Sequence, residues 1–409
     1  MKQKLNATVL DDDVFPIVGW AGLSGDMITP ETMRDMRKAG FTVNHGNLKG
    51  RDPVEVLDIA HAAGMRMIVC ADVLHVDDGL VVTDERRQAI ESLVRRIQDH
   101  PGLYMYHLRD EPRWKTLEPL AEVAKIVRTL DRHHPCYVNH NPPIGGREAA
   151  TAEELIRKAC ELMPPDFLSY DHYVMCVASQ DELRAEAGAP WMLPEAHLRI
   201  KPDFYQCLQC FRTLSQVYRV PFWAFTNAVR HGSYPPPTEA QIRFQLMSAL
   251  AYGARGLQYF TYAYDSAMVR PDGSTTETWE MARRVNADIH AMTPLLRTLE
   301  PIGVYHSGPL WPMTERPPAD LLKIEGDPAL VGVFRGADGL LYLLVVSKNP
   351  CAWSMLNLKP FRPEPIFEFD VRDGSWARPY PRRPENQPLT LAPGEGRLLR
   401  LGGEGQSRF

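Results

Sequence analysis

The chain alternates short apolar runs with amphipathic stretches over about 300 residues. Each apolar run has the length of a buried strand, and each amphipathic stretch repeats its apolar positions with the period of a helix. The predicted strands are residues 15–20, 41–45, 65–74, 103–108, 135–139, 167–174, 220–226 and 256–262. Apolar strands separated by helices indicate a parallel sheet covered on both faces. Eight such units predict an α/β protein with a (β/α)8 TIM barrel.

A doubly wound open sheet is the alternative for alternating strands and helices. Such a sheet commonly binds a dinucleotide through a GxGxxG turn after its first strand. Gly19, Gly22 and Gly25 lie near the end of the first predicted strand, but their spacing differs from that motif. We therefore favour the barrel.

The pattern changes beyond residue 300. Strand-like runs at 329–334, 340–347, 367–371 and 396–401 are separated by turns rather than by helices. This predicts a small antiparallel β-domain, sandwich-like, after the barrel. The expected division is a catalytic barrel over residues 1–300, the β-domain over 301–402 and a flexible tail over 403–409.

Composition excludes several kinds of partner. Hydrophobic residues make up 44% of the chain and charged residues 24%, which is typical of a globular protein. Lys and Arg total 46 against 51 Asp and Glu, and a net charge of −5 gives no basic field for nucleic acid. No apolar run approaches the ~20 residues of a membrane-spanning helix. We expect neither a nucleic-acid nor a membrane partner, and the composition specifies no oligomeric state.

The seven cysteines and the first residues bear on the compartment. An odd number of cysteines scattered through apolar stretches indicates reduced thiols rather than a disulfide framework. The opening MKQKLNATVLDDDVFP has no apolar core of a signal peptide. The visible sequence therefore predicts a cytoplasmic protein, or a periplasmic or secreted one if a leader has been removed.

Barrel enzymes carry their reactive groups at the carboxyl ends of the strands. In this chain nearly every predicted strand ends in polar or aromatic side chains, a combination that suits a sugar, whose ring faces stack and whose hydroxyls need partners. The predicted substrate-binding residues are Trp20, Asn44, His45, His107, Asp110, Asn139, His140, Tyr173, Asn227 and Tyr262.

The sharpest chemical feature is Asp110-Glu111-Pro112 at the end of the fourth strand. A carboxyl group held over a barrel mouth among aromatic rings can have a raised pKa and act as a general acid. The alternative is structural: Asp110 caps the following turn, and Glu111 pairs with Arg109 or Arg113.

This motif resembles the Asn-Glu-Pro of clan A glycoside hydrolases, and its Asp-Glu-Pro form resembles poorly characterised bacterial β-galactosidase-like members. Residues 236–260 are similar to their seventh helix and eighth strand. The resemblance covers the barrel to about residue 300, and the trailing β-domain matches their usual layout. It implies a glycosidase that acts on a sugar or oligosaccharide, with Glu111 as the acid/base. Asp110 would take the position of the Asn that contacts a sugar hydroxyl.

The chain departs from that family at the seventh strand, where clan A enzymes carry a nucleophilic Glu. Residues 221–227 read PFWAFTN and contain no acid. Asp171 after the sixth strand is the first choice for the second catalytic carboxylate, ahead of Asp265 and Glu195. The separation of the two carboxyl groups would decide between retention and inversion.

Two other functions stay open. The missing acid of the seventh strand also fits a carbohydrate-binding protein without catalysis. His45, His107, His140 and His172 fall near strand ends, which fits a metal-dependent barrel enzyme. No HxH or HExxH spacing accompanies these histidines, so the sequence predicts neither a metal nor another cofactor.

Overall fold

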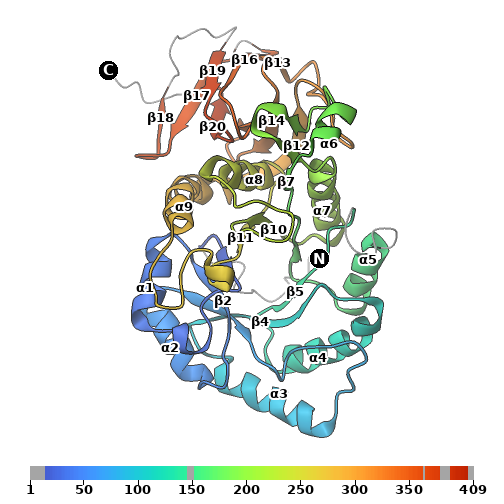
Figure 1. Ribbon diagram of the computed structural model, residues 1–409, viewed down its shortest axis with the longest axis vertical. Coiled ribbons are helices and arrows are strands. Elements are labelled where there is room, and N and C mark those ends of the chain that lie inside the picture. The colour runs from blue at the N-terminus through green and yellow to red at the C-terminus, as the bar shows by residue number, and fades with distance from the viewer. Residues whose placement is uncertain (1–13, 145–151, 363, 378–386, 404–409) are drawn as a thin grey trace. The chain divides into compact units, whose positions relative to one another are not determined.

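The computed structural model describes residues 14–144, 152–362, 364–377 and 387–403 (Figure 1). The chain divides into two compact units, of which the first comprises residues 1–172, 213–228 and 256–283. The second comprises residues 173–212, 229–255 and 284–409. The division at residue 300 stays a prediction. It coincides with the start of β12 (Glu300–His306), and only Gly403 of the predicted tail is described.

A closed parallel sheet forms the centre of the first unit. Its strands follow the order β5-β4-β3-β2-β1-β11-β10-β6, and a bridge between His140 and Tyr170 joins the two ends. They are β1 (Ile17–Trp20), β2 (Val43–Asn47), β3 (Arg66–Cys70), β4 (Leu103–Asp110), β5 (Cys136–Asn139), β6 (Leu168–Tyr170), β10 (Phe222–Asn227) and β11 (Gly256–Phe260). The predicted eight-stranded barrel architecture is therefore confirmed.

Helices alternate with these strands along the chain. The first five strands are followed by α1 (Pro30–Lys38), α2 (Pro53–Ala62), α3 (Asp84–Ile97), α4 (Leu117–Leu130) and α5 (Ala152–Leu162), which lie outside the sheet in Figure 1. The last three strands precede α7 (Phe204–Tyr218), α8 (Glu239–Ala251) and α9 (Glu277–Leu296). In the described part of the chain, no helix is both long and apolar enough to cross a membrane.

Local chemistry explains where the helices begin. The Thr29 hydroxyl accepts the Thr32 N–H before α1, and the Asp52 carboxylate accepts two N–H groups before α2. Pro30 and Pro53 occupy the first helical positions, where a missing N–H costs nothing. These caps satisfy donors that a helix start otherwise leaves unpaired.

A β-bulge in β4 decides which side chains face the barrel interior. His107 pairs with Tyr137 of β5 and Arg109 pairs with the next residue, Val138, so that Leu108 is extra. Side chains alternate along a strand, and one extra residue reverses the alternation beyond it. Asp110, rather than Glu111, therefore lies on the same face of β4 as His107.

The predicted strand limits are wrong by two or more residues at several strands, among them the fourth, third and sixth. β4 extends two residues beyond 108, to Asp110. The runs 65–74 and 167–174 end as strands at Cys70 and Tyr170. The Leu74 N–H bonds to the Ala71 carbonyl, so the chain turns there although its residues stay apolar.

Two antiparallel sheets of the second unit contain the strands from Glu300 onward, which confirms the predicted C-terminal β-structure. One has the order β12-β14-β15-β20-β17-β18 and the other β13-β16-β19. Besides β12, they consist of β13 (Leu322–Gly326), β14 (Ala329–Arg335), β15 (Leu341–Ser347), β16 (Ser354–Pro360), β17 (Ile366–Asp370), β18 (Ser375–Ala377), β19 (Gln387–Leu391) and β20 (Gly396–Leu401). The two sheets share one apolar core that includes Val331, Leu343 and Leu356.

Helix α8 packs against β14, β15 and β20 within the second unit. Gly332 allows this close approach, because a Cβ atom there would lie 2.3 Å from the Ala251 carbonyl oxygen. A small antiparallel sheet lies between β6 and α7 in the sequence and consists of β7 (Met175–Val177), β9 (Leu198–Ile200) and β8 (Met192–Leu193).

Candidate active site

One buried amide holds two carboxylates together at the mouth of the barrel. Asn139, at the end of β5, is 1% exposed, and its Nδ2 donates to Asp110 Oδ1 at 3.0 Å and to Asp171 Oδ1 at 2.9 Å. Because both oxygens bond to the same nitrogen, they lie no more than about 6 Å apart. Asp110 ends β4 and Asp171 follows β6, so three neighbouring strands contribute the group.

A chain of buried side chains fixes the orientation of that amide. The Gln258 amide nitrogen donates to Ser169 Oγ at 2.8 Å, and the Ser169 hydroxyl donates to Asn139 Oδ1 at 2.8 Å. The Tyr137 hydroxyl donates to the Gln258 amide oxygen at 2.7 Å. Because Asn139 Oδ1 accepts the Ser169 hydroxyl, the NH₂ group of Asn139 must face the two carboxylates. Sequence reasoning missed Tyr137, Ser169 and Gln258 as site residues. A Ser and a Gln inside apolar strands were the available signal, because buried polar groups need partners.

The environment of Asp110 favours its protonated form. Its side chain is exposed to solvent, and neighbouring protein partly desolvates the carboxyl group. This desolvation, together with the nearby Glu111 carboxylate, raises the pKa of Asp110 to about 6. The Asn139 hydrogen bond and the Arg109 guanidinium act in the opposite direction. A carboxyl with such a pKa can serve as a proton donor near neutral pH.

Glu111 occupies an unusual backbone conformation directly after β4. Its φ of 47° lies in the left-handed region, which costs a non-glycine residue about 1–3 kcal/mol, and its N–H donates to the Asn139 carbonyl. Neither predicted arginine partner pairs with it: Arg109 bonds Asp77 at 3.0 Å, and Arg113 lies 3.7 Å from Asp78. The alternative in which Glu111 forms an ion pair with Arg109 or Arg113 is therefore wrong.

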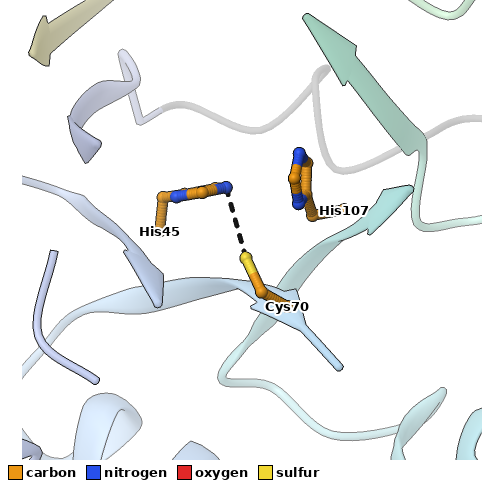
Figure 2. Close-up of side chains that lie close together, drawn as sticks. All are labelled: His45, Cys70 and His107. Carbon is orange, nitrogen blue, oxygen red and sulfur yellow. Dashed lines mark hydrogen bonds between the residues drawn. The ribbon is translucent and has the colours of Figure 1, made fainter. Parts of the chain in front are cut away.

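Beside the carboxylates lies a cluster of rings at the ends of β1, β2 and β4. The Trp20 and His45 rings stack at 3.7 Å, and Trp20 meets the ring of His107 edge-on at 5.5 Å. His45 Nε2 lies 3.2 Å from Cys70 Sγ at the end of β3 (Figure 2). Burial lowers the pKa of His45 well below its usual value and that of His107 to about 3, so both imidazoles are neutral.

Other predicted residues of the first unit are buried and already engaged. The Asn44 amide bonds the Leu23 backbone twice at 2.9 Å, which holds the loop after β1. Tyr262 is 1% exposed and packs against Phe41. Burial lowers the pKa of His140 to about 4, and Asn227, 2% exposed, ends β10.

Tyr173 and the two weaker acid candidates lie elsewhere. Tyr173 belongs to the second unit, where its ring contacts those of His231 and Tyr234. Glu195 belongs to the same unit, and Asp265 is exposed on a short 3₁₀ turn. Within the first unit, the structure therefore brings Asp110, Asn139 and Asp171 together and leaves Asn44 and Tyr262 in structural surroundings.

Comparison with known proteins gives a likeness of fold. The sequence matches no protein-family model and no curated protein. A glycoside hydrolase family 5 structure from Bacteroides vulgatus aligns over 95% of this chain and 89% of its own, with a TM-score of 0.58 and 12% identity. A catalytic mutant of a GH42 β-galactosidase from G. stearothermophilus aligns over 96% and 98%, with a TM-score of 0.56 and 9% identity.

A β-galactosidase from the psychrophilic Marinomonas ef1 aligns over 70% of this chain, with a TM-score of 0.49 and 12% identity. The chain spans 62% of that protein's length. From the two longer alignments, the fold of this chain is similar to the barrels of family 5 and family 42 glycoside hydrolases.

Proposed function

We propose that the protein is a glycoside hydrolase that cleaves a glycosidic bond of a sugar or oligosaccharide. The observation that carries the proposal is the pair Asp110 and Asp171, held by one amide at the carboxyl ends of β4 and β6. Glycoside hydrolysis commonly uses two carboxyl groups, one of them protonated. The likeness of the fold to glycoside hydrolase barrels supports the same class.

The two carboxyl groups receive different roles from their surroundings. Asp110, with its raised pKa, donates a proton to the oxygen of the departing sugar while the carboxylate of Asp171 attacks the anomeric carbon. Asp110 then takes a proton from water as that water displaces Asp171. Their nearest oxygens lie within about 6 Å, below the ~6.5–9.5 Å that leaves room for water in an inverting enzyme. We therefore propose retention of configuration.

Glu111 is the acid/base that the sequence resemblance implies. Two observations favour Asp110 for this role. The bulge in β4 puts Asp110 on the interior face, and Asp110 bonds the amide that also holds the second carboxylate. We propose that Glu111 acts on Asp110 electrostatically, since its negative charge raises the pKa of that carboxyl.

Hydrolysis of a broad panel of aryl glycosides and oligosaccharides tests the proposal. Asp110→Asn should lower kcat/KM by at least ~100-fold, and most for poor leaving groups, which depend most on the acid. Asp171→Asn should remove turnover. Glu111→Gln should lower kcat/KM by less than ~10-fold, because the charge of Glu111 acts only on Asp110. Glu122→Gln, at an exposed carboxylate of α4, is the matched control. A variant series in which Glu111→Gln alone is inactive would restore Glu111 as the acid.

A carbohydrate-binding protein without catalysis is the second candidate. It is favoured by β10, which ends in Thr226-Asn227 where related enzymes carry an acid. Calorimetry distinguishes the two functions: sugars that bind with measurable heat but are never cleaved, by wild-type protein across the panel, would establish this alternative.

A further inference from the structure

We propose that His45, Cys70 and His107 form a binding site for one divalent metal ion of the zinc type. Nothing in the proposed hydrolysis uses Cys70. Imidazole nitrogen and thiolate sulfur are the ligands that zinc prefers, in contrast to the oxygen ligands of magnesium and calcium.

The barrel framework brings the three side chains together. They stand near the carboxyl ends of β2, β3 and β4, and Cys70 and His107 are paired directly across β3 and β4. Figure 2 shows a nitrogen of His45 pointing at the Cys70 sulfur, with the His107 ring on the other side of the thiol. One ligand atom from each residue lies within 4.8 Å of the other two.

These spacings fit a tetrahedral ion. Zn–S bonds of about 2.3 Å and Zn–N bonds of about 2.0–2.1 Å place ligand atoms about 3.3–3.6 Å apart at tetrahedral angles. His45 Nε2 and Cys70 Sγ already lie 3.2 Å apart. The other two separations, from His107 to His45 and to Cys70, are each at most 4.8 Å, so each must shorten by no more than about 1.5 Å to reach the tetrahedral value.

The surroundings leave a ligand atom available. His107 is 8% exposed, and its Nε2 has no hydrogen-bond partner among the described residues. A buried polar atom without a partner is unfavourable, and a metal bond would remove that cost. Trp20 covers one face of His45 and restricts the ring.

Charge and proton balance also fit. Binding forms one metal–sulfur and two metal–nitrogen bonds, and the Cys70 thiol releases its proton to the solvent buffer. Two neutral imidazoles and one thiolate leave a net charge of +1 on a divalent site. Burial and the Asp110 carboxylate raise the pKa of the free Cys70 thiol, and a bound cation would oppose both by stabilising the thiolate. Three protein ligands leave the fourth position for water, the arrangement typical of catalytic rather than structural zinc.

Cobalt(II) titration of the full-length protein tests the site. Co²⁺ replaces zinc in such sites, and a thiolate bond gives a near-ultraviolet sulfur-to-cobalt band. We expect one ion per chain, the thiolate band, and displacement of Co²⁺ by one equivalent of Zn²⁺. Cys70→Ser should lose the band, and His107→Ala should weaken binding at least ~10–100-fold. Cys136→Ser, at a buried free cysteine of β5, is the matched control and should bind as wild type does.

The outcomes separate this proposal from the proposed hydrolysis, on which it does not rest. Wild-type protein that binds no Co²⁺, or binds it without a thiolate band, overturns the metal site even if the variants fail to fold. The metal site is also overturned if folded Cys70→Ser still binds one Co²⁺ per chain with the sulfur-to-cobalt band. Metal binding is measured without any glycoside, so an inactive protein with an intact band refutes only the hydrolase.

Discussion

Replacing Asn139 by Asp is the most direct test of the two-carboxylate arrangement. The two side chains have nearly the same shape, so Asn139→Asp exchanges a donor for an acceptor with little change in packing. The new carboxyl would stand at about 3 Å from Asp110 and from Asp171. Two charges 3 Å apart repel by about 5 kcal/mol at an effective dielectric constant of 20. The folded state should therefore retain a proton within this group.

The retained proton sets both the size and the pH dependence of the effect. Holding a proton that an unfolded Asp of pKa ~3.9 has released costs about 1.4 kcal/mol per pH unit above that pKa. Because Asp110 of the wild type already holds a proton below pH 6, the variant should differ little from the wild type at pH 5 and should lose up to about 1.4 kcal/mol of unfolding free energy between pH 6 and pH 7. The sign follows because the folded state binds more protons than the unfolded state, so its stability falls as pH rises.

Urea unfolding followed by circular dichroism at pH 5, 6 and 7 measures this dependence. Asn139→Ala is the matched control, because it removes the same donor without adding a charge. Its unfolding free energy should show no comparable dependence on pH. A destabilisation of Asn139→Asp that stays constant over pH 5–7, or parallels that of Asn139→Ala, would refute the close approach of the carboxylates.

Three further predictions concern acidity and packing. Because Asp110 must be protonated to act as the acid, kcat/KM of the wild type should fall as pH rises through about 6. A pH–rate profile measures this fall, and activity that rises through that pH would contradict the role of Asp110 as the acid. The folded-state pKa of Asp110 is raised, so its ionisation destabilises the fold above the unfolded pKa, and Asp110→Asn should raise the melting temperature at pH 7 more than at pH 4. Gly332→Ala should lower the urea midpoint, by about 1–3 kcal/mol in free energy, because the added Cβ meets the Ala251 carbonyl; an unchanged midpoint would contradict the close packing of α8.

The architecture could be predicted because each barrel unit repeats one local signal. An apolar run, a polar strand end and an amphipathic helix recur eight times, and parallel pairing brings all the strand ends to one rim. Asp110, Asn139 and Asp171 were each identified by that rule alone. Their mutual bonding was not predictable, because it depends on which side chains point inward at three separate strands.

The choice between Asp110 and Glu111 illustrates what local patterns lack. Simple alternation from His107 puts Glu111 on the interior face of β4, in agreement with the sequence resemblance. The single extra residue at Leu108 reverses that assignment, and a bulge depends on pairing with β5 rather than on the β4 sequence itself. The left-handed φ of Glu111 is likewise fixed by its bond to Asn139 and has no signature in a non-glycine residue.

The use of aspartates follows from the strands that supply them. Neighbouring strands lie about 4.8 Å apart, so backbones two strands apart are separated by about 9–10 Å. β4 and β6 stand in that relation, with β5 between them, and short side chains directed inward from both reach the same amide of Asn139. The proposed site thus brings together a close carboxylate pair from β4 and β6, whereas the clan A enzymes that the sequence resembles use glutamates on their fourth and seventh strands. Backbones two strands apart lie closer than backbones three strands apart, so aspartates on β4 and after β6 are long enough to bond the same amide.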